Sequence, residues 1–211
     1  LALIFWGLFM KVYVADNLAP IVEAQFGNPE VTGFGALIGV YAFAFQIYGD
    51  FAGYSNVARG CAKLLGIELM VNFRSPYISI NPSEFWRRWH ISLSTWLRDY
   101  LYIPMGGNRV NVVFTYRNLA LTMLLGGLWH GATWLFVLWG AYQGTLLIVH
   151  RLTSELVSDV PILNATRRWT PAGMVKMLLM FQFVCIGWLI FRGQSVAQIM
   201  DMLGAIFTMR G

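Results

Sequence analysis

Long runs of apolar residues, separated by short polar segments, dominate the chain. The runs cover residues 33–46, 119–129, 132–149 and 174–191. None of them shows the regular alternation of a half-exposed strand, and a helix needs roughly 20 mostly apolar residues to cross a bilayer. The pattern therefore predicts an all-α integral membrane protein with several spans, organised as one membrane domain over residues 1–211.

A segment that mixes aromatic and charged side chains interrupts this pattern. Asn81, Pro82 and Glu84 together form a typical helix start, so the sequence predicts a helix over residues 85–101. Its charged side chains are too many for a lipid-facing span. The helix either lies at the membrane interface or is embedded in the protein, with its charges facing a cavity. These charged and ionisable residues are Arg87, Arg88, His90, Arg98 and Asp99.

Turn-forming residues mark the predicted connections. Residues 16–32 contain two prolines and are predicted as a loop. Residues 119–149 form either one kinked span or two spans that meet at Gly131. Residues 1–15 resemble the tail of a helix, and the chain opens without methionine. We therefore expect a fragment of a longer protein that lacks N-terminal spans.

Composition agrees with a membrane location. Hydrophobic residues make up 57% of the chain and charged residues only 12%, with a mean hydropathy of +0.58, whereas soluble domains carry about 25% charged residues. The net charge of +5 resides in the connecting segments, where it favours contact with membrane lipid head groups over nucleic acid. Cys61 and Cys185 show no metal-ligand spacing, and no metal site is expected.

His130 is the first candidate for chemistry, because ionisable residues within membrane segments tend to be functional. Gly126 and Gly127 precede it by one helical turn on the same face. They leave room beside the imidazole for a substrate or for a neighbouring backbone. The alternative interpretation is purely structural, since small residues also allow close helix packing in membranes.

His90 and Asp50 are two further candidates. His90 is either an interfacial residue beside two arginines or a partner of His130. Asp50 lies in an otherwise apolar run and is expected to neutralise an arginine such as Arg87 or Arg88, with direct catalysis as the alternative.

Histidine chemistry suits acyl transfer. A histidine titrates near neutral pH, so it can remove a proton from an alcohol that attacks a thioester. The sequence contains no HExxH motif, Walker loop, GxSxG elbow or dinucleotide-binding turn. Zinc proteolysis, ATP hydrolysis and serine hydrolysis therefore have no support from sequence motifs.

Three blocks resemble the bacterial branch of the membrane-bound O-acyltransferase (MBOAT) family, in particular its alginate O-acetyltransferases. They are YGDFAGYS at residues 48–55, EFWRRWHISLSTWLRDYLYIP at 84–104 and LLGGLWHGA at 124–132. The segments NFRSPY at 72–77 and GGNR at 106–109 accompany them in the expected order. The resemblance extends over nearly the whole chain.

The resemblance implies a ring of helices around a central tunnel in which donor and acceptor meet. It places the active-site histidine at His130 and its essential companion at His90. It also implies an acetyl-CoA or other acyl-CoA donor substrate, no bound cofactor, a polysaccharide acceptor such as alginate, and a periplasmic or extracellular acetyltransferase partner. The expected location is the bacterial inner membrane, with several passes.

The residues expected to shape the tunnel surround these two histidines in the sequence. The expected tunnel residues are Trp89, Arg87, Arg88, Asp99, Trp129, Gly126, Gly127 and Asp50.

Two other functions stay open: a proton-coupled transporter that uses the intramembrane ionisable residues as a relay, and a scaffold for a periplasmic acetyltransferase.

Overall fold

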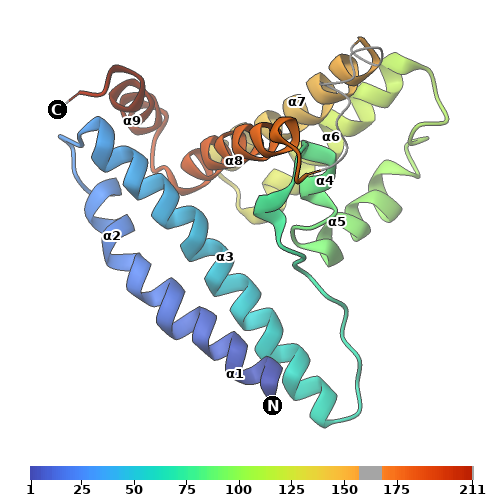
Figure 1. Cartoon of the computed structure of the whole chain (residues 1–211). Helices are drawn as coiled ribbons and strands as arrows, with labels where there is room; N and C mark the ends of the chain where they lie inside the picture. The colour runs from blue at the N-terminus through green and yellow to red at the C-terminus, as the bar shows by residue number, and fades with distance from the viewer. Residues whose placement is uncertain (157–167, 211) are drawn as a thin grey trace. The chain divides into compact units, whose positions relative to one another are not determined.

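The computed structural model describes residues 1–156 and 168–210, and within them every regular element is a helix. Figure 1 traces their course, and the all-α prediction is confirmed. In chain order the helices are α1 (Ala2–Leu8), η1 (Phe9–Ala15), α2 (Asp16–Phe26), α3 (Gly33–Leu64), η2 (Pro76–Ile78), α4 (Pro82–Trp86), α5 (Ile91–Leu97), η3 (Arg98–Tyr102), α6 (Val112–His130), α7 (Trp134–Leu156), α8 (Pro171–Arg192) and α9 (Val196–Thr208).

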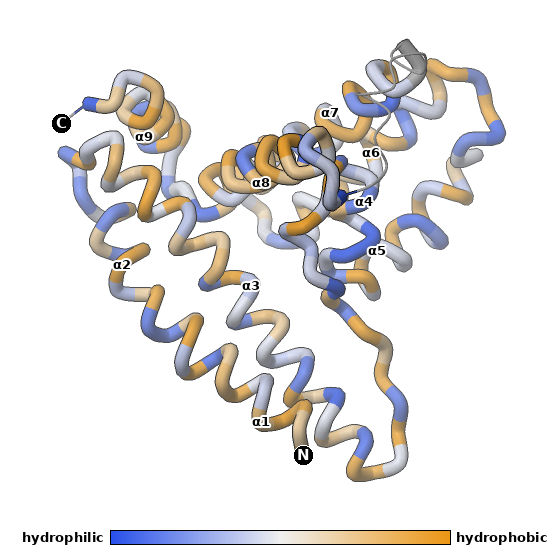
Figure 2. The backbone as a smooth tube through the Cα atoms, in the orientation of Figure 1, coloured by the Kyte–Doolittle hydropathy of each residue, from blue (hydrophilic) through white to orange (hydrophobic). Residues whose placement is uncertain are grey.

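Four helices are long and apolar enough to cross a membrane: Ala2–Phe26, Gly33–Leu64, Trp134–Ser154 and Pro171–Arg192. Hydrophobic residues predominate along α8 (Figure 2). On this helix Val175, Leu178, Leu179 and Phe183 are all exposed, and their spacing of three and four residues gathers them on neighbouring turns. An exposed apolar stripe of this kind suits contact with lipid chains, which confirms the predicted membrane protein.

The chain divides into two compact units, Leu1–Asn72 with Trp188–Gly211, and Phe73–Gly187. The expectation of a single membrane domain stays a prediction.

Glycines bring the helices of the first unit into close contact. A Cβ on Gly7 would lie 2.5 Å from the carbonyl oxygen of Gly53, and a Cβ on Gly53 would lie 2.7 Å from that of Gly7. The backbones of α1 and α3 therefore meet without intervening side chains, a common mode of helix packing in membranes. Thr32 caps α3 by accepting a hydrogen bond from the N–H of Gly35 at 3.0 Å.

The predicted loop over residues 16–32 is wrong for its first part, because α2 continues the helix to Phe26. Pro20 lies within α2 and contributes no N–H to the helix. The segment just before it is the π-helix η1, and α2 packs along α3. Tertiary packing has thus outweighed the local turn signal of the proline.

In the second unit, α6 and α7 form a hairpin that also depends on glycine. A Cβ on Gly127 would lie 2.2 Å from the carbonyl oxygen of Phe136, and one on Gly140 would lie 2.5 Å from that of Met123. Helix α6 ends at His130 and α7 begins at Trp134. The second alternative for residues 119–149 is therefore correct, because two separate helices meet at Gly131.

The predicted continuous helix over residues 85–101 is wrong. Helix α4 ends at Trp86, a turn occupies residues 87–90, and α5 begins at Ile91. His90 closes the turn with a φ of 42°, a left-handed backbone conformation that no helix interior contains. The predicted helix start is confirmed, because Asn81 Oδ1 accepts a hydrogen bond from the N–H of Glu84 at 2.8 Å.

Candidate functional site

His130 lies at the end of α6, within a group of aromatic rings. Its ring centre is 5.0 Å from that of Trp129, 5.2 Å from that of Trp139 and 6.2 Å from that of Phe136. Trp139 is almost fully buried at 2% exposure, whereas Trp129 is 62% exposed. The imidazole therefore lies between the packed interior of this unit and its surface.

His90 is held in place by its own backbone conformation. It is the N-cap of α5, and its Nδ1 accepts a hydrogen bond from the N–H of Leu93 at 3.4 Å. The hydroxyl of Ser92 lies 3.3 Å from the same nitrogen. Because the Leu93 N–H can only donate, Nδ1 must carry a lone pair. The proton of the neutral ring then lies on Nε2.

Trp129 connects the two histidines. The rings of His90 and Trp129 meet edge to face with centres 6.2 Å apart, and His130 follows Trp129 in the chain. Burial lowers the pKa of His90 to about 4, with a smaller contribution from the charge of His130. His90, which lies outside the four candidate spans, is therefore neutral at physiological pH, and the structure brings the two predicted histidines into one site.

Trp89, the neighbour of His90, is a core residue of this unit and is only 5% exposed. Its ring stacks on that of Phe85 with centres 5.8 Å apart, and the ring of Phe73 meets it edge-on at 5.0 Å. Trp89 therefore anchors the turn that carries His90. The prediction that it lines a tunnel stays a prediction.

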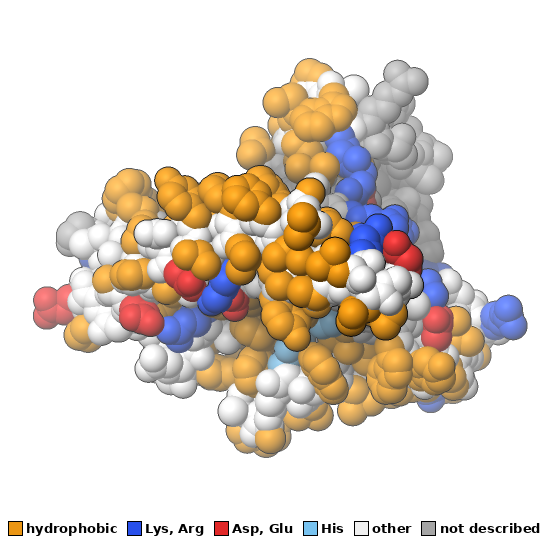
Figure 3. Space-filling model, turned by 90° about the horizontal axis from the view of Figure 1, so that it is seen from below, with side chains coloured by type: hydrophobic (Ala, Val, Ile, Leu, Met, Phe, Trp, Pro, Cys, Tyr) orange, Lys and Arg blue, Asp and Glu red, His pale blue; other side chains and the backbone are white. Residues whose placement is uncertain are grey.

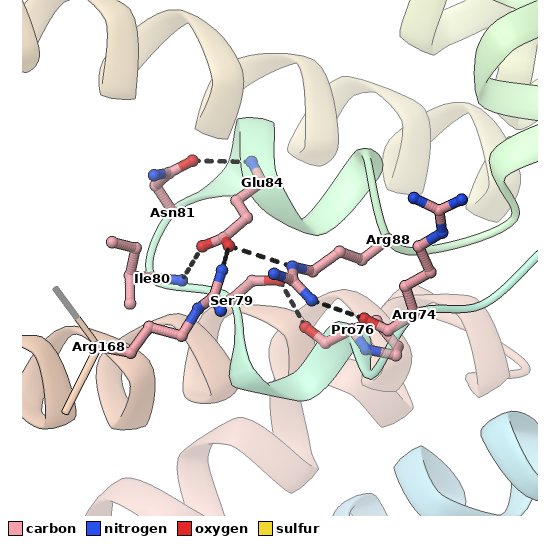
Figure 4. Close-up of polar contacts among 8 residues, drawn as sticks. All are labelled: Arg74, Pro76, Ser79, Ile80, Asn81, Glu84, Arg88 and Arg168. Atoms are coloured by element: carbon pink, nitrogen blue, oxygen red, sulfur yellow. Dashed lines mark hydrogen bonds and ion pairs between the residues drawn. The ribbon is translucent and has the colours of Figure 1, made fainter. Parts of the chain in front are cut away.

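Glu84 is the centre of a polar cluster beneath the same turn (Figure 4). Its carboxylate accepts hydrogen bonds from the N–H of Ile80 at 2.9 Å, from Nε of Arg88 at 3.1 Å and from the guanidinium of Arg168. Arg88 also donates to the carbonyl oxygen of Arg74 at 2.8 Å. The cluster thus ties two distant parts of the chain, at Arg74 and Arg168, to the residues just before His90.

The charge of Glu84 is well compensated although its side chain is only 11% exposed. Burial alone raises the pKa of this carboxyl, but the Ile80 N–H together with Arg168 and Arg88 outweighs burial, so the net pKa is lowered. Glu84 is thus held as an anion. The sequence indicated only a helix-capping role for it, and no sequence signal pointed to Arg168, which lies 84 residues away.

The two glycines before His130 differ in what they contact. Gly127 faces the backbone of α7, as described above, so the neighbouring-backbone interpretation is correct for it. A Cβ on Gly126 would lie 3.1 Å from Cδ1 of Leu97, so this position faces α5. Both glycines therefore serve packing between helices in the structure.

Three other predicted residues lie elsewhere. Arg87 is exposed on the turn before His90. Asp99 forms an ion pair with the adjacent Arg98 at 2.7 Å, and both side chains are well exposed. Asp50 belongs to the first unit, where it pairs with Lys11 at 2.8 Å. The structure therefore pairs Asp50 with a lysine where the sequence led us to expect an arginine.

A space-filling view shows histidine side chains at the surface, surrounded by hydrophobic ones (Figure 3). Among the residues that the structure describes, no group of three or more His, Cys, Asp or Glu side chains could hold a metal ion. The site offers two imidazoles, the hydroxyl of Ser92, indole rings and backbone amides. Such groups can move a proton and orient a hydroxyl or a carbonyl.

The sequence is similar to known membrane-bound O-acyltransferases over most of its length. The sequence model of the membrane-bound O-acyltransferase family matches residues 1–191. A probable alginate O-acetylase of Azotobacter vinelandii is 47% identical over 96% of this chain and 38% of its own length. A peptidoglycan O-acetyltransferase of Helicobacter pylori is 40% identical over 97% of this chain and 38% of its own length.

A more distant relative transfers a different group. The teichoic acid D-alanyltransferase of Bacillus subtilis is 31% identical over 89% of this chain and 47% of its own length. The chain thus spans less than half the length of these curated relatives.

Proposed function

The chain belongs to the membrane-bound O-acyltransferase family, and from that premise we propose that it carries the catalytic histidines of an enzyme that acylates a polysaccharide. The acyl group is acetyl, and the acceptor is a hydroxyl of an exported polymer such as alginate. The similar alginate O-acetylase and peptidoglycan O-acetyltransferase support this choice. The single observation that carries the proposal is the placement of His90 and His130 on one indole, that of Trp129.

In this proposal His130 is the general base. It removes the proton of the acceptor hydroxyl while the oxygen attacks the carbonyl carbon of an acyl thioester. The new C–O bond forms as the C–S bond breaks, and the departing thiolate takes up the proton from the imidazolium. The products are an ester and a free thiol, so no oxidant or metal is required.

His90 takes the orienting role. Since its Nδ1 accepts from Leu93, its neutral ring offers the Nε2 proton as a hydrogen-bond donor. Such a donor can hold the acceptor oxygen or stabilise the oxyanion of the tetrahedral intermediate. The geometry of His90 therefore favours an orienting role over that of a second base.

The proposal also includes the acyl donor, the membrane location and a partner protein. The donor is acetyl-CoA or another acyl-CoA supplied from the cytoplasm, and no cofactor stays bound. The protein crosses the bacterial inner membrane several times, and a periplasmic or extracellular acetyltransferase partner completes transfer to the polymer. The four candidate spans support the membrane location, and the polymer-acylating relatives support a polymer as the acceptor.

A donor assay tests the proposal. The full-length protein that contains this chain is purified in lipid and supplied with radiolabelled acetyl-CoA, and His130→Ala and His90→Asn are compared with the wild type. Asparagine is chosen at position 90 because it tolerates the left-handed backbone. We expect label release by the wild type, complete loss in His130→Ala, and reduced release in His90→Asn.

The alternatives make different predictions. Release that is unchanged in His130→Ala, with equal amounts of folded protein, would contradict the assignment of the base. Proton-coupled uptake into vesicles without any acyl donor would indicate the transporter. Polymer acetylation that survives loss of both histidines, provided the partner is recruited, would indicate the scaffold.

A further inference from the structure

Helix α9 is apolar but too short to cross the membrane. Its 13 residues extend about 20 Å, whereas the hydrocarbon core is about 30 Å thick. An apolar helix of this length is either buried in the core of a protein or lies at the membrane interface. The contacts of α9 and the exposure of its side chains distinguish these two positions.

The ends of three candidate spans meet at α9. Gln198 of α9 donates a hydrogen bond to the carbonyl oxygen of Phe26, the last residue of α2, at 2.6 Å. A Cβ on Gly33, the first residue of α3, would lie 2.3 Å from the carbonyl oxygen of Ala205 in α9, and Figure 1 shows α9 beside this end of α3. Helix α8 ends at Arg192, whose guanidinium lies 5.5 Å from the ring centre of Phe26, and α9 follows after a short connector.

These three span ends define the level of α9 in the membrane. Helix α8 has 22 residues and is about 33 Å long, close to the thickness of the hydrocarbon core. The ends of such spans lie at the level of the lipid head groups. Because the three ends and α9 belong to the same compact unit, α9 lies across them at the membrane surface.

One edge of α9 packs against the protein and another is apolar and exposed. Ile199, Met202 and Ala205 are at most 3% exposed, and α9 packs on α3. The exposed apolar side chains have spacings of four, three and four residues, which place them within about 60° of the helix circumference. This apolar edge consists of Val196, Met200 and Phe207, which are 55%, 62% and 79% exposed, and the half-buried Leu203.

The third edge of α9 is polar. Asp201 is exposed on it and pairs with Arg210 at 3.4 Å. Asp201 also lines a hollow of about 410 Å³ together with the amide side chains of Asn28, Gln194 and Gln198. Amides and a carboxylate are well solvated by water and by lipid head groups, so this edge suits the aqueous side of the interface.

We propose that α9 lies flat in the membrane interface and inserts its apolar edge among the acyl chains of phospholipids. The polar edge then faces the head groups and water. Lipid is the partner that fits this surface, because the change from apolar to polar side chains around α9 matches the change from acyl chains to water at the level of the span ends. This contact with lipid does not depend on the proposed acyl transfer.

Spin labels on the full-length protein in liposomes measure the position of α9. The background carries Cys61→Ser, because Cys61 is exposed, keeps the buried Cys185, and lacks any other reactive cysteine of the full-length protein. Electron paramagnetic resonance then measures collision of each label with oxygen, which concentrates among acyl chains, and with a water-soluble nickel chelate. The labelled variants are Met200→Cys and Phe207→Cys on the apolar edge, with Ala197→Cys and Thr208→Cys, both exposed on the polar edge, as matched controls.

We expect the labels on the apolar edge to collide with oxygen and to be shielded from the nickel chelate, at a depth of about 5–10 Å below the head groups. The labels on the polar edge should collide with the chelate. The proposal is overturned if the apolar edge is shielded from both reagents, because another protein segment or a second copy would then cover it. It is also overturned if both edges collide equally with the chelate.

A photo-crosslinker gives a second measurement that needs no cysteine substitution. Phe207→p-benzoylphenylalanine keeps a phenyl ring at this exposed position and reacts on irradiation with neighbouring C–H bonds. Mass spectrometry of the irradiated liposomes should show the protein with the added mass of one phospholipid. Crosslinks to peptide alone would overturn the proposal even if a labelled cysteine variant folded poorly.

Discussion

The imidazole of His90 and the indole of Trp129 meet edge to face, with ring centres 6.2 Å apart. This contact joins two helical segments that are separated by about forty residues, because His90 precedes α5 and Trp129 lies at the end of α6. It is the direct structural link between the two histidines that we assign to catalysis.

Replacing the indole should separate the histidines. In Trp129→Ala the edge-to-face contact is lost, and misplacement of a catalytic group by about 1 Å can cost about 100-fold in rate. We therefore expect kcat to fall by about that factor while the protein stays folded. Trp129→Phe, which keeps an aromatic ring, should retain more activity. Trp6→Phe, at an exposed tryptophan of the other unit, serves as the control. Equal kcat in Trp129→Ala and wild type would contradict the assignment.

Removing the charge of Glu84 should destabilise the fold. Glu84→Gln leaves Arg88 and Arg168 partly buried without their counter-charge. Breaking a buried ion pair from one side costs about 3–5 kcal/mol, and we expect a loss of free energy of unfolding near the lower end. Thermal unfolding in detergent measures it. Glu68→Gln removes the exposed pair with Lys63 and should cost less than about 1 kcal/mol. If Glu84→Gln and Glu68→Gln lowered the free energy of unfolding equally, this would contradict the role of Glu84 as the buried centre of the polar cluster.

The α6–α7 hairpin should not tolerate a methyl group at position 127. In Gly127→Ala the new Cβ would overlap the carbonyl oxygen of Phe136, which is backbone and cannot rotate away. Overpacking typically costs about 1–3 kcal/mol, and we expect the upper part of this range. Gly204→Ala is the matched control in helix α9, where nothing lies within 4 Å of the new Cβ, and it should stabilise by up to about 1 kcal/mol. Equal thermal stability of the Gly127→Ala variant and the wild type would mean that the helices are not in contact.

His90 should stay neutral well below the usual histidine range. Its pKa is lowered from 6.5 to about 4, so the unfolded chain binds a proton at this residue between those values and the folded chain does not. Stability should therefore fall as pH decreases from 6.5 towards 4. The pKa is read from the NMR titration of ¹⁵N-labelled histidine, which is tractable because the chain holds only three histidines. A His90 signal that titrates near 6.5 would contradict the burial of the ring.

The sequence predicted the features that depend on local chemistry. Residues 81–84 contain an N-cap, a proline and an acid in the order that begins a helix, and α4 begins there. The apolar runs likewise indicated the spans, because the length and composition of a segment decide whether it can cross a bilayer. The pairing of His90 with His130 came from family resemblance, since no local pattern joins residues that far apart.

The features that depend on tertiary contacts could not be predicted in the same way. Helical spacing of aromatic residues continues through residues 87–90, so periodicity gave no sign of the break before His90. The break accompanies the Glu84 cluster, whose partner Arg168 follows a long intervening segment. In the same way, the lysine partner of Asp50 comes from another helix, and only the packing of α1–η1 on α3 brings the two together.

The Glu84 cluster also sets an order for assembly during synthesis. The Ile80 and Arg88 groups that bind this carboxylate are near neighbours in sequence, so they are available as soon as α4 forms. Arg168 emerges 84 residues later, after α6 and α7 have been made. Until then the carboxylate lacks one of its two guanidinium partners. A chain truncated before residue 168 would therefore keep Arg88 as the guanidinium partner of Glu84 and lose the contact that ties the turn before His90 to the start of α8.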